Sequence, residues 1–194
     1  MLLQDNEISE ELCGACQQNP PPWEKAIATF VYAYPLDRLV IGLKYHGRLD
    51  YADTLAALMS QDLQYAYANN ENIHKNGLPQ ALLPVPLHPI REFQRGYNQA
   101  HLLANALSRH LSVPVLPGLV HRVRHTPRQS LLSQEQRQKN LQKAFQVNHK
   151  IEIPEFVALI DDVMTTGATA EAVSKALISA GVKRVDVWCC ARAE

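Results

Sequence analysis

The sequence predicts an α/β fold in which a parallel sheet is flanked by helices. Short apolar runs typical of buried strands alternate along the chain with longer segments whose apolar residues recur at helical spacing. Within residues 157–180 an apolar run, a hydroxyl-rich turn and a helical pattern follow one another directly. The chain has 194 residues, of which 46% are hydrophobic and 20% charged, so it can bury the core of one medium-sized domain.

The first half of the chain is predicted to hold one strand and two helices. The apolar residues 26–34 predict the strand, and a polar break at residues 69–77 ends this part of the chain. Between them lie two amphipathic helices, the second over residues 51–67. Their apolar faces are Leu36, Leu39, Val40 and Leu43 in the first helix, and Leu55, Leu58, Met59 and Leu63 in the second.

The second half is predicted to alternate strands with helices. Apolar strands are expected at residues 81–85, 144–147 and 157–160, and an alternating strand at residues 185–190. Gly181 is the expected stop of the helix before that last strand. The apolar faces of the two helices are Ala100, Leu103, Ala104, Leu107 and Leu111, and then Ala170, Val173, Leu177 and Ala180.

We expect three segments along the chain. Residues 1–22 hold a cysteine turn and a stiff linker of three prolines. Residues 23–78 are expected to form a hood, or cap, and residues 79–194 the core that carries the chemistry.

The turn after residues 157–160 predicts an anion site. Asp161 and Asp162 stand at the carboxyl end of that apolar run, where ligands bind in open α/β sheets. Gly167 allows a backbone turn that other residues resist, and Thr169 begins the following helix. A helix N-terminus favours a phosphate because its unpaired N–H groups and its dipole point at the ligand.

The two adjacent carboxylates predict a different contact, because they would repel a phosphate. They can accept hydrogen bonds from vicinal hydroxyls of a sugar, or act through a bound divalent cation. The competing interpretation is an ordinary strand, turn and helix whose acids face solvent.

A second cluster of polar residues follows the strand at residues 81–85. Arg91 and Arg95 supply fixed positive charge, and residues 96–99 offer backbone donors and amides. Guanidinium groups pair with phosphate oxygens in a forked geometry, so this loop suits a pyrophosphate. The alternatives are a surface charge for Arg91 and helix capping for Arg95 and Asn98.

Charge is unevenly distributed along a chain whose formal net charge is zero. Residues 91–143 contain nine Lys or Arg against two acids, Glu92 and Glu135. Such a basic segment suits a pyrophosphate-bearing substrate or nucleic acid, and the alternative is a solvated face.

Four cysteines give a weaker signal. Cys13 and Cys16 have the spacing of a zinc knuckle, but a structural zinc needs four ligands, so half a site is visible. Three explanations compete. The other cysteine pair of a zinc site was lost or lies upstream, or Cys13 and Cys16 form a redox dithiol, or their spacing is incidental. No thioredoxin-like pattern surrounds them to support the redox role. Cys189 and Cys190 lie in the last strand and are expected in the core.

The segment around the two acids resembles the phosphoribosyl pyrophosphate (PRPP) motif of type I phosphoribosyltransferases. This resemblance implies a type I phosphoribosyltransferase fold with residues 79–194 as its core. It also implies that Asp161 and Asp162 bind the ribose 2- and 3-hydroxyls and that the loop holds the 5-phosphate. The PRPP-binding residues that it implies in this segment are Asp161, Asp162, Val163, Thr165, Thr166, Gly167, Ala168 and Thr169.

Further motifs narrow the resemblance to the ComF/GntX family of competence-associated, phosphoribosyltransferase-like proteins. Residues 95–99 after residues 84–87, and residues 43–47, match that family, and Cys13 with Cys16 matches the second half of its four-cysteine zinc finger. The chain departs from the pattern by lacking the first cysteine pair. The remaining matches are residues 126–129, Arg137, residues 140–141 and residues 144–145.

The resemblance implies transfer of phosphoribosyl from PRPP to an unknown nitrogen acceptor, a nucleobase or an amine, with release of pyrophosphate. Mg²⁺ would accompany PRPP, and Zn²⁺ would occupy the cysteine site if it is complete. Asp161, Asp162 and Arg95 are the expected catalytic residues. Other contacts to PRPP are expected from Asn98, Gln99 and Arg137, with Arg122, Arg124 and Lys44 as further candidates.

The alternative implied by the family is a non-catalytic accessory protein that binds single-stranded DNA or DNA-uptake and DNA-processing proteins. The basic segment would bind the phosphate backbone, and Phe93 or Tyr97 would stack on bases. No Ser-His-Asp or metal-hydrolase pattern is visible, and His88 is the one histidine expected near the cleft. No signal sequence and no membrane-span pattern are visible, so we expect a cytoplasmic protein that makes no contact with a membrane.

Overall fold

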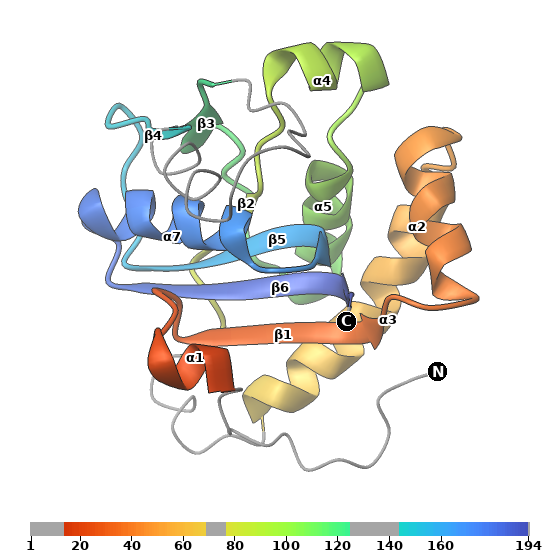
Figure 1. Ribbon diagram of the computed structural model, residues 1–194, viewed down its shortest axis with the longest axis horizontal. Coiled ribbons are helices and arrows are strands. Elements are labelled where there is room, and N and C mark those ends of the chain that lie inside the picture. The colour runs from red at the N-terminus through yellow and green to blue at the C-terminus, as the bar shows by residue number, and fades with distance from the viewer. Residues whose placement is uncertain (1–13, 69–76, 125–143, 194) are drawn as a thin grey trace.

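A four-stranded parallel sheet forms the centre of the computed structural model, which describes residues 14–68, 77–124 and 144–193. The strand order is β1-β6-β5-β2, and every neighbouring pair is parallel (Figure 1). The strands are β1 (Lys25–Val31), β2 (Ala81–Pro84), β5 (Phe156–Met164) and β6 (Arg184–Arg192). This arrangement confirms the predicted α/β class with a parallel sheet.

Helices cover both faces of the sheet (Figure 1). One face packs against α2 (Leu36–Tyr45), α3 (Asp50–Ala68) and α5 (Gln99–Leu111), and the other packs against α7 (Ala168–Ser179). The smaller elements are α1 (Gly14–Gln18), α4 (Pro89–Arg95) and an antiparallel pair, β3 (Val120–Arg122) with β4 (Phe145–Val147). Among the described helices, none combines the length and the apolar character needed to cross a bilayer.

The side-chain alternation of β5 builds two cores. Ala158 and Ile160 pack into the core shared with α3 and α5, whereas Val157 and Leu159 pack into the core shared with α7. A strand covered on both faces needs apolar residues at every position, because its side chains alternate between the two faces. This requirement explains the unbroken apolar run that predicted the strand.

The structure extends one predicted strand and shows how the predicted hood packs. β5 does not end at Ile160 but continues through both aspartates to Met164, because β6 pairs with it along that length. Residues 23–78, the predicted hood, contribute β1 to the central sheet, and α3 packs against α5. The division of the chain near residue 78 stays a prediction. Most of the polar break at residues 69–77 lies outside the described residues.

The predicted helices are confirmed, with one residue on the wrong face. Leu36, Val40 and Leu43 of α2 are buried, as are Leu55, Met59 and Leu63 of α3. Leu58 was expected on the same apolar face but is 37% exposed. Its place in the apolar stripe was therefore wrong, and it lies on the solvent side of α3.

A buried polar network joins the end of α3 to β6. The hydroxyl of Tyr67 donates to Asp186, and the indole N–H of Trp188 donates to that hydroxyl at 3.1 Å. Arg184 donates to both carboxylate oxygens of Asp186, at 3.2 and 3.0 Å, and pairs with Glu24 at 3.3 Å. Because these charged and polar atoms find partners, the network fixes α3 on the sheet without leaving a buried charge uncompensated.

Candidate functional site

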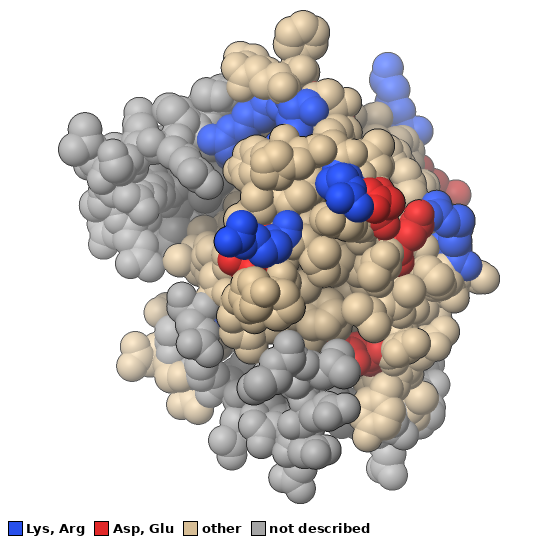
Figure 2. Space-filling view, turned by 90° about the vertical axis from the view of Figure 1, so that its right-hand side faces the viewer, with Lys and Arg blue, Asp and Glu red and all other residues tan. Residues whose placement is uncertain are grey.

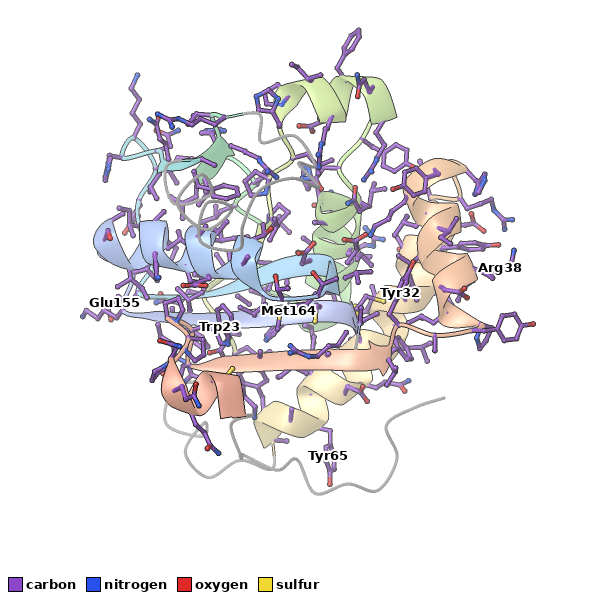
Figure 3. All side chains as sticks on the ribbon, in the orientation of Figure 1. Trp23, Tyr32, Arg38, Tyr65, Glu155 and Met164 are labelled. Atoms are coloured by element: carbon purple, nitrogen blue, oxygen red, sulfur yellow. The ribbon has the colours of Figure 1, made fainter. Side chains whose placement is uncertain are left out.

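The turn between β5 and α7 is built around Gly167. Its φ of 75° lies in the left-handed region that favours glycine. A Cβ added there would also lie 3.1 Å from the ring of Trp23 and 3.8 Å from Met164, both of which Figure 3 labels. Glycine is therefore required for two reasons, the backbone conformation and the close approach of an indole ring.

The start of α7 opens into a small cavity of about 60 Å³. The N-cap residue of α7 is Gly167, which makes no side-chain cap, so the N-terminal end of the helix keeps its positive character toward this space. Thr165 and Thr166 are exposed beside it, and the amide of Ala168 donates to Thr166 Oγ1 at 3.4 Å. The cavity is lined by Asp161, Val163, Met164, Thr165, Thr166, Gly167, Ala168, Thr169 and Ala170.

The two aspartates have different surroundings. Asp161 lines the cavity at the start of α7. Asp162 is buried, and its Oδ2 lies 2.6 Å from Lys44 Nζ of α2. The backbone amide of Asp162 donates to Asp161 Oδ1 at 2.9 Å. The structure therefore brings Asp161 to the cavity with the whole predicted loop, and places Asp162 against a lysine of the predicted hood.

The pKa of Asp161 is raised well above the usual value for a carboxyl group. Burial is the largest cause and the negative charge of Asp162 is the next, while the positive charge of Lys44 acts in the opposite direction. A carboxyl in this state gains from any ligand that supplies hydrogen-bond donors or positive charge. The site is thus suited to hydroxyl groups of a sugar or to a divalent cation.

The segment between β2 and α5 uses several of its predicted site residues to hold its own fold. Asn98 caps α5 by accepting from the amide of Ala100 at 3.0 Å, and it donates to the carbonyl of Val85 at 3.0 Å. Gln99 is buried and accepts from Arg95 Nη1 at 2.5 Å. Capping, the alternative interpretation of Asn98, is therefore what the structure shows. His88 caps α4, with Nδ1 accepting from the amide of Ile90 at 3.3 Å.

A larger cavity of about 490 Å³ lies between α2 and α4. Arg95 lines it and stacks over the ring of Tyr45 at 5.1 Å. Tyr97 donates from its hydroxyl to the carbonyl of Leu43 at 2.5 Å, which ties the loop before α5 to α2. The full lining is Lys44, Tyr45, Gly47, Arg91, Gln94, Arg95 and Tyr97.

Tyr45 lies in the segment 43–47 that matched the family, but no site role was predicted for it or for Gln94. The sequence marked Lys44 as a candidate anion contact, but a single sequence could not show its pairing with Asp162. Lys44 takes part in both features of the site, because it contacts Asp162 and also lines the larger cavity.

The remaining candidates are scattered. Arg122 stacks over Phe145 at 5.4 Å, and its pKa is lowered, mainly by burial and also by the charge of Arg91. Arg124 is exposed. Arg137, together with the family motifs at residues 126–129 and 140–141, lies outside the described residues.

The cysteines divide into two groups. Cys13 lies outside the described residues, and Cys16 of α1 is half-buried. Within residues 14–68, 77–124 and 144–193, no three His, Cys, Asp or Glu side chains are grouped as metal ligands, so zinc stays a prediction. Cys189 and Cys190 are buried, which confirms their place in the core, and burial raises the pKa of both thiols to about 12.

Several curated proteins are similar to this chain over most of its length. It is 42% identical to competence protein F of Haemophilus influenzae over 183 residues, which are 93% of this chain and 78% of that protein. It is 35% identical to the DNA utilization protein YhgH of Escherichia coli K12, again over 93% of this chain and 77% of that one. Competence protein ComFC of Bacillus subtilis is 33% identical over 100 residues, 52% of this chain and 39% of that protein.

The chain was also compared with family models and with solved structures. No family model matches the chain. Among solved structures, a purine phosphoribosyltransferase from Pyrococcus horikoshii aligns with a TM-score of 0.38 and 12% identity, covering 88% of this chain and 87% of that one.

Proposed function

The chain belongs to the ComF family of competence and DNA-utilisation proteins, and from this premise we propose that it binds PRPP and transfers the phosphoribosyl group to a nitrogen acceptor. The observation that carries the proposal is the cavity at the start of α7. There a carboxyl group, Asp161, and the positive end of a helix face the same small space. A sugar phosphate has the matching pair of groups, hydroxyls at one end and a phosphate dianion at the other.

The 5-phosphate binds at the turn of residues 165–169. The N-cap residue Gly167 has no side chain to occupy the first N–H groups of α7, one of which makes a long hydrogen bond to Thr166 Oγ1, and the exposed hydroxyls of Thr165 and Thr166 add donors. Asp161 then accepts hydrogen bonds from the ribose hydroxyls. Asp162 contributes through its charge and through its contact with Lys44, since it is buried beside that lysine.

The acid pair also suits a magnesium ion. Magnesium prefers hard oxygen ligands and keeps several waters, so a single carboxylate such as that of Asp161 is a sufficient protein ligand. The raised pKa of Asp161 supports this fit, because a nearby cation would relieve the repulsion between the two carboxylates. When bound with PRPP, the ion neutralises negative charge that develops on the leaving pyrophosphate.

Arg95 is the residue of this chain that holds the pyrophosphate. Its guanidinium already lies at the cavity between α2 and α4, where Gln99 and the ring of Tyr45 orient it. During transfer the bond from the anomeric carbon to the pyrophosphate oxygen breaks and a carbon–nitrogen bond forms. A positioned guanidinium stabilises the charge of the departing group, since it forms charge-assisted hydrogen bonds to phosphate oxygens.

Calorimetry with PRPP and magnesium tests the binding step. We expect Asp161→Asn to weaken binding by at least about tenfold, the loss of one charge-assisted interaction. Glu152→Gln, a change at an exposed acid outside the cavity, is the matched control and should bind normally. Equal affinities for wild type and Asp161→Asn would reject the site.

A second measurement tests the roles within the ligand. Arg95→Ala should weaken pyrophosphate binding more than ribose 5-phosphate binding, and comparable losses would reject the clamp. Turnover is then sought by screening nucleobases and amines for pyrophosphate release. Binding of single-stranded DNA without any binding of PRPP would instead support the non-catalytic alternative.

A further inference from the structure

The cavity between α2 and α4 has a strongly biased lining. It presents Arg91 and Arg95 together with Lys44, whose charge is paired with Asp162, and none of the described residues that line it is acidic. Figure 2 shows the face of the molecule that carries α2, and the Lys and Arg side chains visible on it lie mainly in its upper half. A concave surface lined by positive charges raises the local concentration of anions, so this cavity favours a negatively charged ligand.

One positive side chain of the cavity, Arg91, has no role in the proposed binding of pyrophosphate. With Arg95 and a magnesium ion assigned to that group, Arg91 still faces the cavity. It also lies close enough to Arg122 to contribute, after burial, to the lowered pKa of that second guanidinium. A second positive charge near Arg91 adds to the attraction of this end of the cavity for an anion.

The same cavity has an aromatic side. Tyr45 is 61% exposed, and Tyr97 is held in place by its hydrogen bond to the carbonyl of Leu43. Exposed tyrosine rings next to arginines are the surfaces on which nucleobases stack. Gln94 adds an amide with both donors and an acceptor, which a base edge can use. The volume of about 490 Å³ falls within the range of roughly 300–1,000 Å³ typical of small-molecule sites.

We propose that this cavity binds a nucleoside monophosphate, with its base against Tyr45 and its phosphate on Arg91, and that this nucleotide is the nitrogen acceptor. The acceptor role rests on the proposed function, whereas the binding itself does not. Lys44 lies between the two ligands, because it contacts Asp162 on one side and the cavity on the other.

The transfer step balances without a further reactant. A nitrogen of the base forms a bond to the anomeric carbon of PRPP, and the bond from that carbon to the pyrophosphate oxygen breaks. The pyrophosphate leaves with the electron pair of that bond. The attacking ring nitrogen uses its lone pair and carries no proton, so after the bond forms the exocyclic amine conjugated to it gives up a proton to solvent. The products are pyrophosphate and a phosphoribosylated nucleotide whose base is neutral.

Calorimetry of the full chain tests the binding part with adenosine and cytidine monophosphates, without PRPP. We expect both nucleotides to bind and the corresponding free bases to bind at least about tenfold more weakly, since they lack the charge-assisted contact. Arg91→Gln and Tyr45→Leu should each weaken nucleotide binding by a similar factor. Arg38→Gln is the matched control, because Arg38 is an exposed arginine on the same helix as Tyr45 and does not line the cavity.

Asp161→Asn separates this inference from the proposed function. That variant should bind PRPP at least about tenfold more weakly and keep the nucleotide, whereas Arg91→Gln should keep PRPP affinity within about threefold. Thermal melts verify folding, and α4, which buries none of its residues, is expected to tolerate Arg91→Gln. Unchanged nucleotide affinity in both Arg91→Gln and Tyr45→Leu would overturn the inference. So would one-for-one displacement of the nucleotide by pyrophosphate, or binding of single-stranded oligonucleotides but not of mononucleotides.

Discussion

Lys44 Nζ lies 2.6 Å from Asp162 Oδ2, and the two side chains are only 20% and 5% exposed. The pair joins α2, an element of the predicted hood, to β5, the strand that carries the acids. It places one positive charge beside two adjacent carboxyl groups. The electrostatic state of the candidate site therefore depends on a residue more than a hundred positions away in the sequence.

Removing the lysine should destabilise the fold. Lys44→Met leaves Asp162 buried without its counter-charge, and breaking a buried pair in this way costs about 3–5 kcal/mol, with the lower end expected because Lys44 keeps some exposure. Urea unfolding measures the change. The matched control is Lys183→Met, since Lys183 pairs with Glu155 on the surface, where both side chains are more than half exposed and such a pair contributes less than about 1 kcal/mol. Equal losses of unfolding free energy in the two variants would show that the buried pair contributes no more to stability than the surface pair.

Asp161 should make stability depend on pH. Its folded-state pKa is raised above the ordinary carboxyl value of 3.8, so the folded state retains a proton that the unfolded state has already released. Stability is therefore full below about pH 4, falls as pH rises between the ordinary and the raised pKa, and then levels off. Asp161→Asn should flatten this part of the curve, measured as the urea midpoint across pH 4 to 8. If the urea midpoint of the variant depended on pH as steeply as that of the wild type, the proton would belong to a group other than Asp161.

The proton held by Asp161 should be released when the ligand binds. Ribose hydroxyls and magnesium both favour the ionised carboxylate, so binding of magnesium–PRPP should release protons from the wild type. Calorimetry in buffers of different ionisation enthalpy counts them. Asp161→Asn should release fewer, and equal counts would contradict the assignment.

The local parts of the site could be predicted from sequence, and the long-range parts could not. An apolar run, Gly167 and a helical pattern are contiguous, so the turn and its left-handed residue followed from local physics. The different surroundings of Asp161 and Asp162 did not follow. Apolar character stops at Ile160, so the strand was expected to end at the two aspartates that follow, whereas pairing with β6 extends it to Met164.

Tertiary contacts account for the other omissions. Lys44, Tyr45 and Arg91 meet at one cavity because α2 and α4 lie beside each other, which no spacing in the chain reveals. For Asn98 the sequence left two roles open, a contact to PRPP and helix capping; its bonds to Ala100 and Val85 show the capping, and the contact to PRPP stays a prediction.

Gly167→Ala should damage the candidate phosphate site more than the fold. The left-handed conformation costs a non-glycine residue roughly 1–2 kcal/mol, and the new Cβ would lie 3.1 Å from Trp23, which forces the turn to shift. We expect PRPP binding to be lost while the protein still folds. Gly181→Ala is the control, because Gly181 also has positive φ but has open space around it and follows the far end of α7. Gly181→Ala should lower the free energy of unfolding by a similar amount and leave PRPP affinity unchanged. If both variants lost PRPP affinity, the loss in Gly167→Ala would reflect general destabilisation and not damage to the phosphate site.

Tyr67→Phe should affect stability without affecting the site. The hydroxyl of Tyr67 donates to buried Asp186 and accepts from Trp188, so its removal leaves a buried carboxylate short of one donor and an indole N–H without its acceptor. Leaving buried polar groups unsatisfied costs roughly 1–3 kcal/mol, which urea unfolding resolves. Tyr65→Phe on the same helix is the matched control, since Tyr65 is 65% exposed and points away from the fold in Figure 3. PRPP affinity should be unchanged in both variants, because Tyr67 and Trp188 pack in the core on the α3 side of the sheet, whereas Asp161 lines the cavity at the start of α7. Loss of PRPP affinity in Tyr67→Phe would mean that the position of α3 on the sheet controls the site.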